Sequence, residues 1–280
     1  MSLKFKENTM GIFSGCLLAS DFDATLTNSE GIVPEEVRAA IRYYIENGGL
    51  FTVCTGRTRQ GFHVYSPDII NAPVLHANGS MAYDFAKNEV VFLNGIGEEN
   101  LPAIQYIKDN YDGIGIELYS SDFKSYVINP DPKNIAHFEF QYIDYTVCDE
   151  IPREVFPAVK IMIYVGTERC DDFQRFLDKA PMGNLKYIPA HGNFIEIINK
   201  NTDKGKGLLQ LAEMLGIDKS RAFAVGDGAN DVDMLKAAAV GFVPENGDPL
   251  AKEAGDVTVK SNDEFAVADV ISRIEAIVRN

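Results

Sequence analysis

Positive charge is scarce in this sequence. The 280 residues include 26 lysines and arginines against 41 aspartates and glutamates, which gives a formal net charge of −15 at pH 7. An excess of negative charge repels the phosphate backbone of nucleic acids and anionic lipid headgroups. The composition therefore argues against nucleic acid and against a membrane surface as partners.

Cysteine and histidine are also rare, with four residues of each. The cysteines are scattered and form no Cys-x-x-Cys pair, so we expect reduced thiols. The histidines cluster neither with one another nor with cysteines, which disfavours a zinc site. No window has the length and apolarity of a transmembrane helix, and the first eight residues lack the apolar core of a signal peptide. We therefore expect a cytoplasmic protein.

The patterns that are present indicate an α/β protein. Apolar residues make up 46% of the chain, and 280 residues suffice for one large or two moderate domains. A helix is expected to begin after Pro34 and to stop at Gly48-Gly49, and a closing helix is expected over 264–278. Alternation of strands and helices predicts a core with a doubly wound parallel sheet. The strand-like runs of this core are 16–19, 50–54, 73–76, 222–225, 240–243 and 257–259.

The middle of the chain has a different texture. From residue 82 to residue 187 the strand-like pieces are more broken, with helix-like stretches between them, which predicts an inserted α+β domain. The run 194–198 alternates in polarity and is predicted to be the strand that returns to the core. We therefore assign 1–81 and 188–280 to the core and 82–187 to the insertion.

Polar clusters follow the strand-like runs or begin a helix. Asp21 and Asp23 come directly after the first strand, and residues two apart on an extended segment point the same way. Two such carboxylates repel each other unless a cation or a shared proton holds them together. Because ligands bind at the carboxyl ends of strands in open α/β sheets, the clusters predict a site. They are Asp21-Phe22-Asp23-Ala24-Thr25, Thr55-Gly56-Arg57, Lys204 and Gly226-Asp227-Gly228-Ala229-Asn230-Asp231.

With these four motifs in this order, the chain resembles the haloacid dehalogenase (HAD) superfamily. The phrase from Gly226 to Leu235 is similar to that of its Cof-type (subfamily IIB) sugar-phosphate phosphatases, and so is the long segment between Arg57 and Lys204. The resemblance implies a Rossmann-like core with an inserted C2-type cap domain that selects the substrate. Ala24 departs from the family, which usually has glycine there, and one added methyl group is not expected to remove the chemistry.

The resemblance implies that Asp21 is a nucleophile that forms an aspartyl-phosphate. Asp23 is then placed to protonate the leaving oxygen and later to deprotonate water. The alternative, that both are solvated turn acids, is disfavoured by the other three motifs.

A magnesium site is implied by the same resemblance. Its ligands would be Asp21, Asp227 and the main-chain carbonyl of Asp23, because Mg²⁺ prefers oxygen ligands. Asp231 would be a further ligand or an acid behind the ligands, and a helix N-terminal acid is the alternative. The ion would let an anionic nucleophile approach an anionic phosphate.

Phosphate binding is implied for a further group of residues. Arg57 either touches the phosphate or pairs with acids of the core. Asn230 either donates to the phosphate or caps a helix. Lys204 would act in catalysis by binding the phosphate and the charged intermediate as a point charge. Such local positive charge is needed in a chain of net charge −15. The group comprises Phe22, Thr55, Gly56, Arg57, Lys204 and Asn230.

Together these features predict a Mg²⁺-dependent phosphomonoester hydrolase acting on small phosphorylated metabolites. Sugar phosphates or phosphorylated cofactors such as flavin mononucleotide or pyridoxal phosphate are the expected substrates. A phosphosugar mutase of the same superfamily is the alternative, and a non-catalytic ligand-binding protein on the same fold is disfavoured because no catalytic acid is missing. Nothing in the sequence indicates an oligomeric state.

Overall fold

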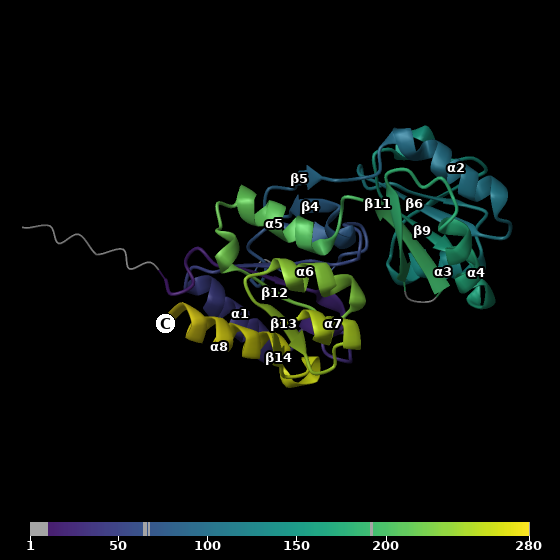
Figure 1. Cartoon of the computed structure of the whole chain (residues 1–280). Helices are drawn as coiled ribbons and strands as arrows, with labels where there is room; N and C mark the ends of the chain where they lie inside the picture. Colours follow the sequence, from purple (N-terminus) through teal and green to yellow (C-terminus); the bar gives the residue numbers. More distant parts are fainter. Residues whose placement is uncertain (1–10, 64–65, 67, 191–192, 280) are drawn as a thin grey trace, which may run out of the picture. The chain divides into compact units, whose positions relative to one another are not determined.

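The computed structural model describes residues 11–63, 66, 68–190 and 193–279 (Figure 1), and over these the chain divides into two compact units. The first unit is formed from Met1–Cys54, Ser66–Val74 and Leu208–Asn280. The second unit is formed from Thr55–Tyr65 and Leu75–Gly207.

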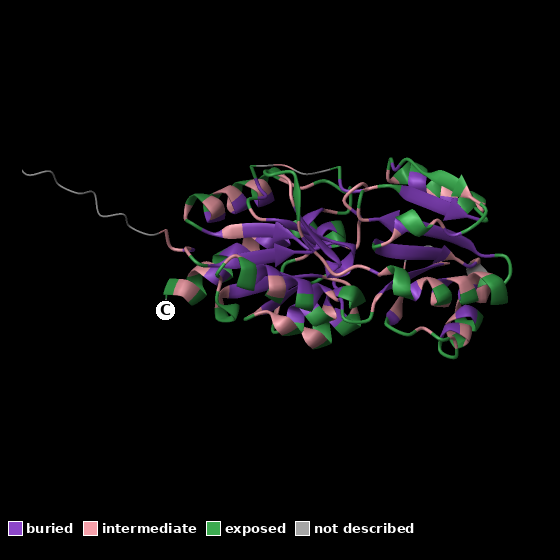
Figure 2. Ribbon diagram, turned by 90° about the horizontal axis from the view of Figure 1, so that it is seen from above, coloured by how far each residue is buried: buried purple, intermediate pink, exposed green. Residues whose placement is uncertain are grey.

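A five-stranded parallel sheet forms the centre of the first unit, as predicted. Its order is β14-β13-β12-β1-β2. Strand β2 lies on one side of β1, and β12, β13 and β14 follow one another on the other side, so the strand order reverses between β1 and β12. Residues in β1 and β12 are fully buried, as expected for a parallel sheet covered on both faces (Figure 2). The strands are β1 (Leu17–Ser20), β2 (Leu50–Val53), β12 (Ala222–Val225), β13 (Gly241–Pro244) and β14 (Val257–Val259).

The two helices whose bounds the sequence predicts are present in the first unit, and the closing helix covers Ala266–Arg279 rather than 264–278. In α1, Pro34 precedes the first turn, Glu35 and Glu36 lie in it, and Val37 and Ile41 are buried. The helix ends before Gly48, whose φ of 89° suits glycine. The helices are α1 (Glu35–Glu46), α6 (Val232–Ala237), α7 (Pro249–Ala254) and α8 (Ala266–Arg279), while α5 (Lys204–Met214) crosses the division between the units.

The second unit is α+β. It contains a six-stranded sheet of order β10-β11-β9-β6-β7-β8, in which the β7–β8 pair is parallel and the other pairs are antiparallel. Its helices are α2 (Leu101–Asn110), α3 (Pro132–Phe140) and α4 (Cys170–Leu177). The strands of this sheet are β6 (Gly115–Ser120), β7 (Ser125–Ile128), β8 (Thr146–Cys148), β9 (Ala158–Tyr164), β10 (Leu185–Ala190) and β11 (Phe194–Asn199). A separate three-stranded sheet contains β3 (Val74–His76), β4 (Met81–Asp84) and β5 (Glu89–Leu93).

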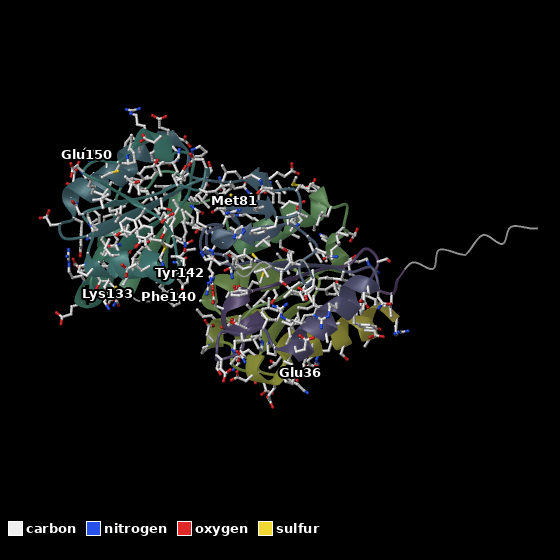
Figure 3. All side chains as sticks on the ribbon, turned by 180° about the vertical axis from the view of Figure 1, so that it is seen from behind. Glu36, Met81, Lys133, Phe140, Tyr142 and Glu150 are labelled. Atoms are coloured by element: carbon white, nitrogen blue, oxygen red, sulfur yellow. The ribbon has the colours of Figure 1, made fainter. Side chains whose placement is uncertain are left out.

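The two faces of the six-stranded sheet differ in chemistry. On one face, Ile116, Ile161 and Ile195 share an aliphatic cluster with Ile104 of α2 and Phe173 of α4. Helix α3 ends at Phe140, and both Phe140 and Tyr142 beyond it are exposed (Figure 3).

The other face carries buried charges. Glu117 and Tyr119 of β6 lie opposite Met162 and Lys160 of β9, and Glu196 of β11 also lies opposite Met162. Side chains of paired residues project from the same face of a sheet. All five are buried, which is unusual for charged side chains unless they have partners.

Two strands differ from their sequence-based predictions. The run 73–76 was expected in the parallel sheet of the core, but β3 lies in the three-stranded sheet, beside β4. The run 194–198 was expected to return to the core, but it lies in β11, which pairs with β9 and β10 of the second unit. A boundary between 187 and 188 therefore divides the β10–β11 hairpin, and the second unit extends beyond 82–187 on both sides. Alternating polarity marks a strand with two unlike faces, and it does not show which sheet the strand joins.

Two compositional expectations can be compared with the structure. Cys16, Cys54, Cys148 and Cys170 all lie in its described part and none is in a disulfide. Among the described residues, no helix combines the length and apolarity needed to span a bilayer.

His76 of β3 is completely buried against aromatic rings. Its ring centroid lies 5.5 Å from that of Phe62 and 5.9 Å from that of Phe85. Burial disfavours the charged imidazolium and lowers the pKa of His76 to about 3. The ring is therefore neutral in the folded protein at pH values where an unfolded chain would already bind a proton.

We expect this histidine to make the protein less stable in mild acid. Because its folded pKa is lowered, its contribution to stability is complete above the unfolded value of about 6.5 and is lost as the pH falls toward 3. Over that window the loss approaches about 1.4 kcal/mol for each pH unit. Denaturant titrations at pH 7 and pH 5 should show a smaller loss in His76→Phe than in the wild type. The matched change at exposed His63 should keep the wild-type loss; equal losses in all three proteins would contradict the assignment.

Candidate active site

Three aspartates gather where β1 and β12 end. Asp21 follows β1, and Asp227 and Asp231 lie in the segment after β12. The two strands are parallel neighbours, with Ser20 paired to Val225, and the Asp21 amide donates to the Val225 carbonyl at 2.8 Å. One carboxylate oxygen from each aspartate lies within 4.8 Å of the others. The sheet changes direction between these strands, which is the position where open α/β sheets bind ligands.

The donor set suits a hard divalent cation. Asp21 and Asp231 are buried and Asp227 is half-buried, so three negative charges share a space that water screens poorly. Carboxylates at such distances repel each other unless a cation or protons neutralise them. Oxygen-only ligands from carboxylates are the set that Mg²⁺ takes. Among the residues that the structure describes, this is the group of acids placed to hold a metal ion.

The geometry bears on both interpretations of Asp231. This residue is the N-cap of α6, and its Oδ2 accepts a hydrogen bond from the Gly228 amide at 2.9 Å. Asp231 also belongs to the carboxylate cluster. A position at the start of a helix is therefore compatible with a position beside the proposed metal site. Asn230 is exposed and lies in the turn Ala229–Asp231, one residue before the N-cap of α6. The N-cap interpretation of Asn230 is therefore not supported.

The turn after Asp21 brings in Thr25, which the sequence motif contains but to which no role was assigned. Its hydroxyl donates to Oδ1 of Asp227, so it orients this carboxylate from the neighbouring strand end. Ala24 has a φ of 58°. The left-handed region favours glycine, which gives a physical reason for the glycine expected at this position. Asp23 is exposed.

The segment Thr55-Gly56-Arg57 is held within the second unit by backbone hydrogen bonds. The Thr55 amide donates to Leu75 at 2.9 Å, and the Asn78 amide donates to the Thr55 carbonyl at 3.0 Å. The Arg57 amide donates to Oγ1 of the buried Thr55 at 3.1 Å. A Cβ placed on Gly56 would lie 3.4 Å from Asn78 Oδ1. Packing within the protein therefore permits a side chain at Gly56.

Lys204 is the first residue of α5 and is completely buried. The start of this helix approaches the turn at Gly79 closely: a Cβ on Gly207 would lie 2.9 Å from Gly79 Cα, and a Cβ on Gly79 would lie 2.5 Å from the Asp203 carbonyl oxygen. Both glycines are thus required by close packing. This packing fixes the position of Lys204 relative to the turn Ala77–Gly79 in the second unit.

The predicted site residues thus fall into two groups. Asp21, Asp227 and Asp231 come together in the first unit, which also contains Phe22, Asp23 and Asn230. Thr55, Gly56, Arg57 and Lys204 belong to the second unit. Asp23 is not a member of the carboxylate cluster, and its predicted ligand atom is its main-chain oxygen.

Sequence reasoning missed some polar residues behind the segment 55–57. Lys160 donates to the Gly56 carbonyl at 2.8 Å and is paired with Glu196. Asn78, which donates to Glu196 at 2.8 Å, is another residue that was not among the predicted site residues. The sequence did offer one signal for these residues. Lys160 and Glu196 are each a charged residue inside a largely apolar strand, β9 and β11.

An open parallel α/β sheet with polar side chains at its switch point is the Rossmann-like, doubly wound class of fold, which binds ligands at that position. The chain matches the family of haloacid dehalogenase-like hydrolases over residues 18–271 and belongs to it. It is a HAD-type phosphatase by this family and by relatives named as phosphatases that match over most of its length.

Similar proteins include curated and structurally solved members of this family. The chain is 25% identical over 283 residues to the 5-amino-6-(5-phospho-D-ribitylamino)uracil phosphatase YwtE of Bacillus subtilis, covering 92% of this chain and 97% of that protein. It is similar to a haloacid dehalogenase-like hydrolase of Bacteroides thetaiotaomicron, with a TM-score of 0.80, 22% identity, and coverage of 92% and 99%. The HAD subclass IIB sugar phosphatase BT4131 gives a TM-score of 0.78 at 18% identity, with coverage of 92% and 98%.

Proposed function

We propose that the chain hydrolyses small phosphomonoesters in a Mg²⁺-dependent reaction that passes through a phosphoryl group on Asp21. The observation that carries this proposal is the cluster of Asp21, Asp227 and Asp231 at the switch point of the sheet. Membership of the HAD-like hydrolases supports the same reaction class.

Asp21 would attack phosphorus through a carboxylate oxygen, and the ester oxygen would leave. The attack splits one difficult displacement into two easier ones. Its main chain is fixed by the hydrogen bond to Val225, so the nucleophile sits on a rigid element. Asp23 is exposed, which suits a residue that would give a proton to the leaving oxygen and then take one from water.

Asp21, Asp227 and, through its main-chain carbonyl, Asp23 would hold the metal ion, with Asp231 beside them. When bound, Mg²⁺ supplies positive charge that lowers the repulsion between the nucleophile and the phosphate. The hydroxyl of Thr25 fixes the orientation of Asp227, and the amide of Gly228 fixes that of Asp231. These contacts hold the carboxylates in place before substrate arrives.

The phosphate-binding role is proposed for Thr55, the amide of Gly56 and Lys204, with Phe22, Arg57 and Asn230 as further contacts. Packing within the protein would permit a side chain at position 56, so packing does not explain why this residue is glycine. Close approach of a phosphate to the Gly56 amide would explain it. Lys204 is a fully buried ammonium, and such a group binds a dianion strongly where water is excluded. Hydrolysis is favoured over phosphate retention because Asp23 is available to activate water.

The substrate is proposed to be a sugar phosphate or a phosphorylated cofactor, and the segment 82–187 is proposed to act as the cap that selects it. Exposed aromatic side chains at the end of α3, Phe140 and Tyr142 (Figure 3), are candidates for contact with the leaving group. A relative that carries the name of a ribitylaminouracil phosphatase makes a phosphorylated ribityl compound a reasonable member of any substrate panel.

Phosphate release from a panel of sugar phosphates, nucleotides and phosphorylated cofactors, with and without Mg²⁺, tests the proposal. We expect release from several compounds, with the best substrates among small sugar phosphates or cofactors. If no compound releases phosphate but a bisphosphate activator allows isomerisation of a phosphosugar, the mutase alternative replaces the hydrolase.

A further inference from the structure

A buried lysine reaches the back of the proposed phosphate-binding segment. Lys160 stands in the middle of β9, and its side chain is 7% exposed. Its ammonium group donates a hydrogen bond of 2.8 Å to the main-chain carbonyl of Gly56. Lys160 and Gly56 are more than one hundred residues apart in sequence but belong to the same unit.

The position of Lys160 is held by two partners that are themselves buried. Glu196 Oε2 lies 3.3 Å from the Lys160 ammonium, and its side chain is 5% exposed. The other oxygen of Glu196 accepts from the Asn78 amide group at 2.8 Å. Asn78 in turn donates its main-chain amide to the Thr55 carbonyl at 3.0 Å. The ion pair is therefore linked to the segment 55–57 twice, directly through Lys160 and indirectly through Asn78.

A buried ion pair is not explained by stability alone. Removing two charges from water is unfavourable, and replacing such pairs with apolar residues is often neutral or stabilising. On this face of the sheet, Met162 and Phe194 pack with Phe138 of α3 in one apolar cluster. Within these surroundings the Lys160 ammonium group contacts two polar partners, Glu196 and the Gly56 carbonyl, so its role is sought in those contacts.

The carbonyl that Lys160 contacts belongs to the same peptide group as the Arg57 amide. That amide donates to Oγ1 of Thr55 at 3.1 Å. A cation at the carbonyl oxygen polarises the peptide group and strengthens its N–H as a donor. A threonine hydroxyl has one donor and two acceptor positions. When its oxygen accepts from Arg57, its hydrogen is directed elsewhere and is available to a phosphate oxygen.

We propose that Lys160 is a positioning residue that strengthens phosphate binding by Thr55 through the Gly56–Arg57 peptide group. Each hydrogen bond in a chain polarises the next, and we call this chain the relay. It runs from the Lys160 ammonium to the Gly56 carbonyl, from the Arg57 amide to Thr55 Oγ1, and from the Thr55 hydroxyl to the bound phosphate. The lysine never touches the ligand. This inference rests on the proposed function in one respect, the assignment of Thr55 to the phosphate.

Calorimetric binding of inorganic phosphate in the presence of Mg²⁺ provides the test, because it does not depend on turnover. In Lys160→Met we expect the Kd for phosphate to rise about 10-fold, the effect of one charge-assisted hydrogen bond. The double variant Lys160→Met/Glu196→Gln should show the same rise. It leaves no unpaired buried charge, so it remains informative if the single variant unfolds.

The matched control is Tyr119→Phe. Tyr119 lies opposite Lys160 on the same buried face and donates to Glu117 at 2.6 Å, without a contact to the segment 55–57. This variant should keep the wild-type Kd even if its melting temperature falls. A merely structural role of Lys160 predicts the opposite pattern, a lower melting temperature with an unchanged Kd, and that pattern would overturn the proposal.

A double-mutant cycle with Thr55→Val separates a relay from an independent effect. In the Thr55→Val background, Lys160→Met should change the Kd less than about 2-fold, because the end of the chain is already missing. The same factor in both backgrounds would overturn the relay. If the wild type hydrolyses esters but Lys160→Met binds phosphate normally, the relay fails and the proposed function stands. If phosphate binding follows the cycle but no ester is hydrolysed, the proposed function fails and the relay stands.

Discussion

Replacing Asp21 by asparagine is expected to lower kcat for phosphate release by at least about 10⁴-fold, the scale seen when a nucleophile is removed. The amide has almost the size of the carboxylate and keeps the main-chain hydrogen bond to Val225, but it does not attack phosphorus. The change also removes one of three clustered negative charges. The melting temperature without Mg²⁺ should therefore stay the same or rise.

Steady-state kinetics on the best substrate of the panel, together with thermal melts, measures both effects. The control is Asp233→Asn, an exposed acid of α6 outside the cluster, which should keep wild-type activity. Turnover that survives in Asp21→Asn at more than a few per cent would contradict the assignment of the nucleophile.

Removing the divalent cation should have an effect of similar size. With three carboxylates within 4.8 Å and two of them buried, the protein without a cation holds its nucleophile among like charges. We expect a chelator to reduce turnover by about 10³-fold or more, and Mg²⁺ to restore it. Mg²⁺ should also raise the melting temperature, since a ligand at 100 times its Kd stabilises the folded state by about 2.7 kcal/mol.

The variant Asp227→Asn distinguishes the proposed site from other cation effects. It keeps an oxygen that can accept from Thr25 but loses the charge that binds the ion. We expect it to lose both the activity and most of the thermal shift produced by Mg²⁺, while Asp233→Asn keeps both. Turnover that persists in chelator, or a full thermal shift in Asp227→Asn, would be incompatible with the proposed metal site.

The carboxylate cluster was predictable from sequence for a simple physical reason. Asp21 and Asp227 each follow a short apolar run, and parallel pairing brings the ends of such runs to one edge of a sheet. Local patterns therefore sufficed to predict that distant residues meet. The same reasoning located α1, whose amphipathic pattern and terminal residues are local signals.

Other features depended on information that no local pattern carries. The alternation in the run 194–198 was interpreted as a core strand, but β11 pairs with β9 and β10 of the second unit. A lysine inside an apolar strand is usually taken to face solvent. Lys160 is instead buried, and its ammonium group donates to Glu196 and to the Gly56 carbonyl. Both partners are distant from Lys160 in the sequence. Its role becomes visible only when the pairing of the strands is known.

Trapping the phosphorylated nucleophile tests the central claim most directly. Asp23→Asn is expected to slow the attack of water, and an aryl phosphate, whose leaving group departs without a proton, keeps the first step fast. An acyl phosphate should therefore accumulate on mixing with that substrate and Mg²⁺. After rapid acid quenching, borohydride reduction converts a phosphorylated aspartate to homoserine, which peptide mass spectrometry locates. We predict homoserine at position 21, dependent on substrate and Mg²⁺, and no such product in Asp21→Asn/Asp23→Asn. Substrate turnover with no modified residue, or with the modification at another aspartate, would contradict the account.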